Sequence, residues 1–92
     1  MNKVRIEIEP LRLGRLILEK DIKEGATLKD LLNELSTTHP EVIEIFFDLQ
    51  SQKLTGAAAI SLNGRLIQIL KGLETRLGNG DVIAFVPLLT GG

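Results

Sequence analysis

The residues after Pro87 carry the clearest chemical pattern of the chain. They read Leu-Leu-Thr-Gly-Gly and end at Gly92. At roughly 3.3 Å per residue, an extended peptide of this length reaches about 16 Å beyond a folded domain. Frayed termini are commonly disordered and are usually polar, whereas this segment carries Leu88 and Leu89. The pattern indicates an extended C-terminal segment that enters a pocket of another protein. Its apolar part is Leu88 and Leu89, and its narrow end is the two glycines.

Glycine at the tip keeps the last carbonyl accessible. Because glycine lacks a β-carbon, Gly91 and Gly92 can pass through a narrow channel and leave the terminal carbonyl open to a nucleophile. The reactive group would be the α-carboxylate of Gly92, which is ionised and inert near neutral pH. It must exchange an oxygen for a better leaving group before acyl transfer. We expect a separate ATP-dependent enzyme to supply an adenylate, because the sequence lacks a nucleotide-binding loop.

Other catalytic arrangements are not supported by the residue types. The absence of cysteine excludes disulfides, a thiolate metal site and a cysteine nucleophile. The single histidine, His39, is interpreted as a solvent-exposed or capping residue rather than a general base. Glu41 and Glu44 follow at a predicted helix start, where carboxylates complement the helix dipole. The sequence therefore predicts no metal site and no autonomous enzymatic activity.

Composition limits the class of protein. Hydrophobic residues make up 43% of the 92 residues and charged residues 25%, which is typical of one globular domain. The 11 basic and 12 acidic residues give a net charge of −1, which argues against nucleic acid as a partner. There is no apolar run of the ~20 residues that span a membrane, and the N-terminus lacks a signal-peptide core. We expect a soluble cytoplasmic protein.

The chain is predicted to begin with a hairpin and a helix. Residues 4–8 alternate between apolar and charged side chains, which predicts a strand that ends before Pro10. Residues 11–14 would form a turn, and residues 15–20 the returning strand. Thr27 is a suitable helix N-cap. It precedes leucines at helical spacing on one face: Leu28, Leu31, Leu32 and Leu35.

A shorter helix is predicted to follow Pro40, a residue that suits the first turn. Its apolar stripe would consist of Val42, Ile45, Phe46 and Leu49. Residues 50–56 are polar and predict a loop.

The second half predicts another hairpin and a last strand. Residues 58–62 and 65–69 read as strands joined by Asn63-Gly64, a dipeptide typical of a type I′ turn. Residues 71–80 form a connection from which Leu73 and Leu77 enter the core. The apolar run 82–86 then predicts a central strand.

One helix between two hairpins covers one face of the sheet, so the order predicts a two-layer α+β domain. With the last strand beside the first in the centre, the fold is the ubiquitin-like β-grasp, a mixed sheet with one main helix packed on one face. Residues 1–87 would form this domain, and residues 88–92 a flexible tail.

The tail and its flanking residues resemble a known family. Residues 77–92, including Phe85, Pro87 and the terminal Gly91-Gly92, resemble the end of MoaD, the sulfur-carrier subunit of molybdopterin synthase. Residues 62–66 are similar to the penultimate hairpin of the same family. The wider family of sulfur carriers includes ThiS, the thiamine sulfur carrier, and the ubiquitin-related modifiers.

The resemblance implies a role in molybdenum cofactor biosynthesis. An E1-like adenylating enzyme (MoeB-like) would use ATP and magnesium to adenylate Gly92, which would then become a C-terminal thiocarboxylate. The tail would enter the active site of a MoaE-like large subunit of molybdopterin synthase and donate sulfur to cyclic pyranopterin monophosphate. The chain itself would bind no cofactor and would be a non-catalytic, sulfur-donating subunit.

The resemblance also implies which residues dock. Those matching docking positions of the family are, in chain order, Leu66, Phe85, Pro87, Leu88, Leu89, Thr90 and Gly91. Two positions depart from the pattern. Val86 stands where family members often carry an aromatic residue, and Glu7 stands where they carry an apolar one. Phe85 has an alternative role as a core residue.

Three functions remain open. The first is a sulfur carrier, either for the molybdenum cofactor or for thiamine, tRNA thiolation or a tungsten cofactor. The second is a ubiquitin-like modifier whose Gly92 becomes attached to a lysine of a target protein. The third is a β-grasp interaction module with an incidental tail.

Overall fold

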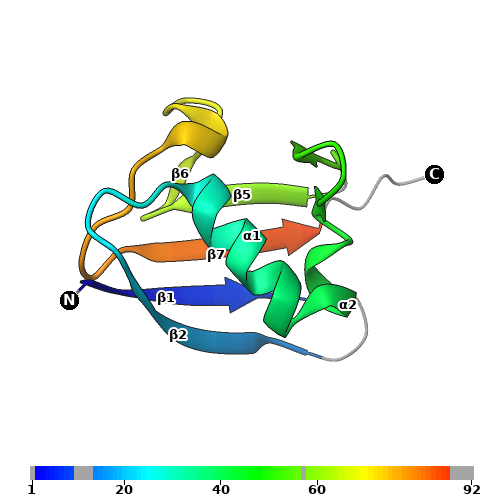
Figure 1. Cartoon of the computed structure of the whole chain (residues 1–92), viewed down its shortest axis with the longest axis horizontal. Helices are drawn as coiled ribbons and strands as arrows, with labels where there is room; N and C mark the ends of the chain where they lie inside the picture. Colours follow the sequence, from blue (N-terminus) through cyan, green and yellow to red (C-terminus); the bar gives the residue numbers. More distant parts are fainter. Residues whose placement is uncertain (1, 10–13, 57, 88–92) are drawn as a thin grey trace.

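The computed structural model describes residues 2–9, 14–56 and 58–87. Five strands form one mixed sheet in the order β2-β1-β7-β5-β6, with the main helix α1 (Leu28–Thr38) across one face (Figure 1). The strands are β1 (Asn2–Ile8), β2 (Leu16–Ile22), β5 (Ala58–Leu62), β6 (Arg65–Leu66) and β7 (Val82–Pro87). β1 and β7 run parallel and the other neighbours antiparallel. The predicted β-grasp fold is therefore confirmed.

The predicted helix is confirmed, and its start has the expected chemistry. The Asp30 amide donates to Thr27 Oγ1 over 3.3 Å, and the Thr27 amide donates to Asp30 Oδ2 over 3.0 Å, forming a capping box. The four leucines of the predicted stripe are at most 1% exposed. They pack against the inner face of the sheet, whose buried side chains are Val4, Ile6, Ile8, Ile22, Ile60, Leu62, Ile83 and Phe85.

The segment after α1 differs from the prediction. The helix α2 (Pro40–Ile43) ends after four residues, so the helical spacing does not continue to Leu49. The buried residues are Ile43, Phe46 and Phe47, whereas Ile45 and Leu49 are 38% and 52% exposed. Of the predicted stripe, Phe46 alone is fully buried, because the chain leaves the helix before the next turn could place the others.

The predicted polar loop also contains a strand. β3 (Phe47–Asp48) pairs with β4 (Lys53–Leu54) as a small antiparallel sheet. Gln52, at the turn between them, has a φ of 58°, and its amide donates to the Asp48 carbonyl over 2.8 Å. Two paired residues on each side leave too short an alternation for the sequence pattern to reveal.

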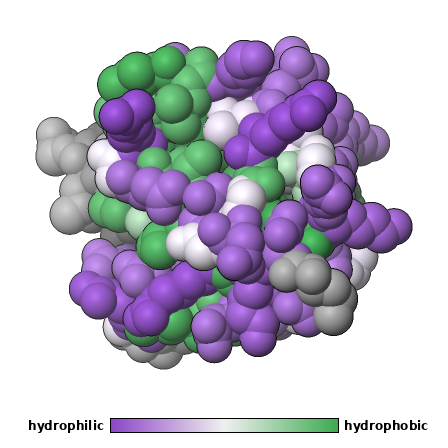
Figure 2. Space-filling view, turned by 90° about the vertical axis from the view of Figure 1, so that its left-hand side faces the viewer, coloured by the Kyte–Doolittle hydropathy of each residue, from purple (hydrophilic) through white to green (hydrophobic). Residues whose placement is uncertain are grey.

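The second hairpin is confirmed at its turn and shorter than predicted beyond it. Asn63 and Gly64 have φ values of 52° and 84°, as a type I′ turn requires. β6 ends at Leu66, because the Ile69 amide donates to the Leu66 carbonyl over 3.0 Å and bends the chain. Ile69 is left 75% exposed. Figure 2 shows an apolar patch at its upper left, over the segment that follows β6.

The connection before β7 enters the core as predicted, with Leu77 5% exposed and Leu73 packed against the core cluster.

Among the helices of the described ranges, none is long and apolar enough to cross a membrane. The boundary between a domain at 1–87 and a tail at 88–92 stays a prediction, because residues 88–92 lie outside the described part of the chain.

Candidate functional site

β7 holds the base of the tail in the centre of the sheet. Ile8 of β1 lies opposite Phe85 on one side, and Ala58 of β5 lies opposite Pro87 on the other. The Glu9 amide also donates to the Phe85 carbonyl over 3.2 Å. Pairing on both sides continues nearly to the end of the strand, so the sheet holds the backbone of β7 as far as Pro87.

Phe85 and Val86 lie on opposite faces of this strand. The Phe85 side chain is 0% exposed and packs against Phe46, with ring centroids 5.3 Å apart. Val86 is 44% exposed. Of the two roles considered for Phe85, the structure favours the core residue, so any effect of Phe85 on docking acts through the position of β7. Val86 is the neighbouring side chain that is available for contact.

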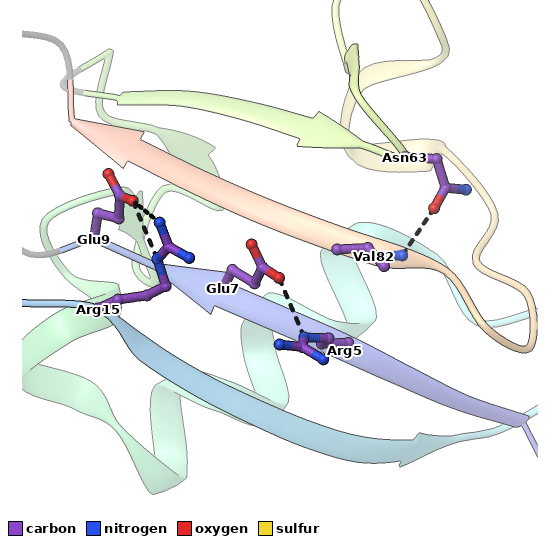
Figure 3. A network of polar contacts seen from close by, with 6 residues as sticks. All are labelled: Arg5, Glu7, Glu9, Arg15, Asn63 and Val82. Carbon is purple, nitrogen blue, oxygen red and sulfur yellow. Dashed lines mark hydrogen bonds and ion pairs between the residues drawn. The ribbon is translucent and has the colours of Figure 1, made fainter.

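The first residue of β7 is hydrogen-bonded to the β5–β6 turn (Figure 3). The Val82 amide donates to Asn63 Oδ1 over 2.9 Å, and Asn63 Nδ2 donates to Asp81 Oδ1 over 2.9 Å. Asp81 Oδ2 accepts from the Gly78 amide, and the Asp81 carbonyl accepts from the Arg5 amide over 2.9 Å. These bonds join the start of β7 to the turn and to β1.

The face of the sheet away from α1 presents apolar side chains along β7 and β6. One row crosses all five strands in register, and it consists of Ile17, Glu7, Ala84, Ser61 and Leu66. Val82 and Val86 lie on the same side of β7 as Ala84, since side chains alternate along a strand. We call these seven residues the outer sheet face. Leu66 and Val86 are each 44% exposed and Ile17 is 45% exposed.

Charged pairs occupy the β1 and β2 side of this face (Figure 3). Arg5 Nε lies 3.1 Å from Glu7 Oε2, and Arg15 NH2 lies 3.0 Å from Glu9 Oε1. Glu7, one of the two departures from the family pattern, is therefore neutralised by a neighbour on its own strand. The outer sheet face has an apolar side along β7 and β6 and an ion-paired side along β1.

The structure brings together some of the predicted site residues. Leu66 on β6 and Phe85 and Pro87 on β7 belong to one sheet, in which β5 lies between β6 and β7. Leu88, Leu89, Thr90, Gly91 and Gly92 lie outside the described residues, so their roles stay predictions. Sequence reasoning missed Ile17, Val82 and Ala84. The alternation of β7 about an inward Phe85 was the signal that could have placed the last two on the outer face.

Side chains that could hold a metal ion do not cluster in the described ranges. Within residues 2–9, 14–56 and 58–87, no three His, Asp or Glu side chains lie together as metal ligands would. His39 lies at the junction of α1 and α2, with Nδ1 2.9 Å from Thr38 Oγ1. The arrangement can present an apolar surface and a strand end to another protein.

The sequence matches one protein family, and the fold is similar to those of several solved structures. Residues 13–92 match the ThiS family. Small archaeal modifier protein 1 from Methanosarcina acetivorans is 28% identical, with a TM-score of 0.70 over 100% of this chain and 98% of that one. A candidate molybdopterin converting factor subunit 1 from Pyrococcus furiosus is 21% identical, with a TM-score of 0.68 over 97% and 100%.

A chain of the BexX/CysO complex from Amycolatopsis orientalis is 18% identical, with a TM-score of 0.65 over 95% of this chain and 99% of that one. Among curated proteins, none matches the chain.

Proposed function

The chain belongs to the ThiS family of ubiquitin-like sulfur carriers and modifiers, and from this premise we propose that it carries sulfur as a thiocarboxylate on Gly92. We further propose that it serves as the small subunit of a molybdopterin synthase. The observation that carries the proposal is the position of β7. This central strand is paired on both sides and ends at Pro87, directly before the Leu-Leu-Thr-Gly-Gly sequence.

The chemistry begins at the α-carboxylate of Gly92. Its oxygen attacks the α-phosphorus of ATP in a partner enzyme, forming an acyl adenylate and releasing pyrophosphate. A donor that supplies sulfur at the oxidation level of sulfide then attacks the carbonyl carbon, and AMP leaves. This chain contributes an unbranched tip, because a β-carbon at position 92 would crowd the carbonyl under attack.

The outer sheet face supports partner docking in this scheme. Leu66 and Val86 present exposed apolar side chains on this face, and Val86 directly precedes Pro87 in the sequence. Apolar surface buried at an interface stabilises a complex. The proposed partners are an E1-like adenylating enzyme, which holds ATP and magnesium, and the large subunit of the synthase. Both would contact the same face in turn, because both must receive the same tail.

The test is mass spectrometry of the intact protein. Incubation with the adenylating enzyme, ATP and a sulfur donor is expected to add the mass difference of one oxygen-to-sulfur exchange. Gly92→Ala, or one residue appended after Gly92, is expected to abolish or severely reduce this product. Charging of Gly92→Ala at the wild-type rate would contradict the proposal, as would a native protein whose last residue is not Gly92.

A second candidate is a protein modifier. It is favoured by the 28% identity to small archaeal modifier protein 1 over the full length of this chain. Both functions begin with adenylation of Gly92 and diverge at the acceptor. Covalent adducts on lysines of other proteins in cell extracts would support the modifier. Consumption of the thiocarboxylate by a pterin intermediate would support the carrier.

A further inference from the structure

The segment after β6 exposes an isoleucine on an ordered turn. Ile69 is 75% exposed, the highest value among the large hydrophobic side chains described, and Leu66 three residues earlier is 44% exposed. Between them Ile67 is buried, at 1%. A single exposed apolar residue is common on protein surfaces, so the surroundings of Ile69 decide whether it has a role.

The backbone holds this isoleucine in place. The Leu70 and Gly72 amides both donate to the Ile67 carbonyl, over 3.0 and 2.9 Å. The Lys71 amide donates to Oγ1 of Thr75 over 3.1 Å, and Thr75 is 7% exposed. The turn is thus hydrogen-bonded to the buried residues Ile67 and Thr75. The backbone of the turn therefore keeps Ile69 at the surface.

A hollow of about 440 Å³ lies beside this turn, lined by Ile69, Leu70, Lys71, Thr75 and Arg76. Its apolar wall comes from Ile69 and from Leu70, which packs against the core. Lys71 and Arg76 are exposed cations.

The cations of this hollow are free to pair with a ligand. The ion pairs formed within the described part of the chain are Arg5–Glu7, Arg15–Glu9 and Lys20–Glu34, and none involves Lys71 or Arg76. Glu74 lies in the 3-10 helix between the two cations but does not line the hollow. The hollow is therefore apolar inside and positive at its rim.

We propose that this hollow is a docking site for a protein segment that presents a large apolar side chain between carboxylates. The apolar side chain would pack against Ile69 and Leu70, and the carboxylates would pair with Lys71 and Arg76. Charge complementarity favours an acidic segment and disfavours a basic one. The site uses neither the tail nor Gly92, so it does not depend on the sulfur-carrier proposal.

The test is an NMR titration of the full-length, ¹⁵N-labelled protein with a synthetic peptide in which leucines are flanked by Asp and Glu. Amide shifts are expected to change within residues 65–76, and the affinity is expected to fall as salt is added. Ile69→Ser should weaken binding about tenfold, since ~1.4 kcal/mol corresponds to one decade. Lys71→Glu should weaken it about threefold or more.

Matched controls lie on other parts of the surface. Ile45→Ser removes an isoleucine that is 38% exposed after α2, and Lys53→Glu reverses an exposed lysine on β4. Both are expected to leave the affinity unchanged. A peptide with Lys in place of Asp and Glu is expected not to bind.

Four results would overturn the proposal: equal binding of the basic peptide, unchanged affinity of Ile69→Ser, shifts centred outside residues 65–76, or no shifts. A fifth would assign the site to another occupant. The charged residues that line another hollow are four carboxylates and one lysine, namely Asp21, Glu24, Asp30, Glu34 and Lys23. Its net negative charge would suit the positive rim of this hollow on a second copy of the chain. In that case the amides of residues 65–76 would shift with protein concentration alone.

Discussion

The rings of Phe46 and Phe85 pack with centroids 5.3 Å apart and planes tilted by 51°. Phe46 lies between α2 and β3, and Phe85 lies two residues before the end of β7. Tilted aromatic pairs of this kind are favourable beyond their buried area. The contact ties the strand that precedes the tail to the layer that covers the sheet.

Truncating Phe85 should therefore destabilise the domain. Phe85→Ala is expected to lower the free energy of unfolding by about 3–5 kcal/mol, as for other buried aromatic residues. Phe85→Leu, which preserves more of the volume, should cost less. Urea denaturation followed by circular dichroism measures both. Val86→Ala, at the exposed neighbouring position, should cost less than about 1 kcal/mol, and an equal loss at both positions would contradict the assignment of faces.

Charged substitutions on the outer sheet face should affect docking and spare the fold. Leu66→Asp and Val86→Asp are each expected to weaken binding of the adenylating enzyme by about ten- to a hundredfold. Isothermal titration calorimetry measures the affinity, and thermal melting reports stability. Leu49→Asp is the matched control, because Leu49 is 52% exposed in the β3–β4 segment. Comparable weakening by Leu49→Asp would place the interface elsewhere.

The ion pair between Arg5 and Glu7 should contribute little to stability. Both side chains are partly exposed, at 49% and 29%, and such pairs typically contribute about 0–1 kcal/mol. A double-mutant cycle with Arg5→Gln and Glu7→Gln is expected to give a coupling energy in that range, decreasing at high salt. A coupling of several kcal/mol would mean that the pair is shielded from solvent.

Asn63 should stabilise the β5–β6 turn in two separable ways, through its positive φ and through its side-chain bonds to Val82 and Asp81. Asn63→Ala loses both and should cost about 1–3 kcal/mol. Asn63→Gly keeps the favourable backbone conformation and should cost less. Chemical denaturation of the two variants separates the effects. If alanine were tolerated as well as glycine, the positive φ would not be maintained in solution.

The elements that could be predicted are those with long, regular patterns. The leucines of α1 repeat over two turns behind a capping residue, and β7 is an apolar run bounded by Asp81 and Pro87. The Asn63-Gly64 turn was predictable because few residues adopt positive φ readily. In each case the local sequence and the final environment favour the same structure.

The segment from Pro40 to Leu54 could not be predicted in this way. Its helix has four residues, and its two strands have two each, so no period is repeated. Ile43, Phe46 and Phe47 are buried because the core lies beside them. Likewise β6 ends at Leu66 although the apolar residues continue, because hydrogen bonds within the following turn replace strand pairing.

By itself the sequence determined the α+β class, the main helix, the central last strand and a tail of residue types suited to acyl chemistry. It also determined that Phe85 and Val86 lie on opposite faces, because strand side chains alternate. Only the tertiary structure decided which of them is buried, since α1 and Phe46 cover one face of the sheet. Burial depends on what packs against a residue, and that partner lies far away in the sequence.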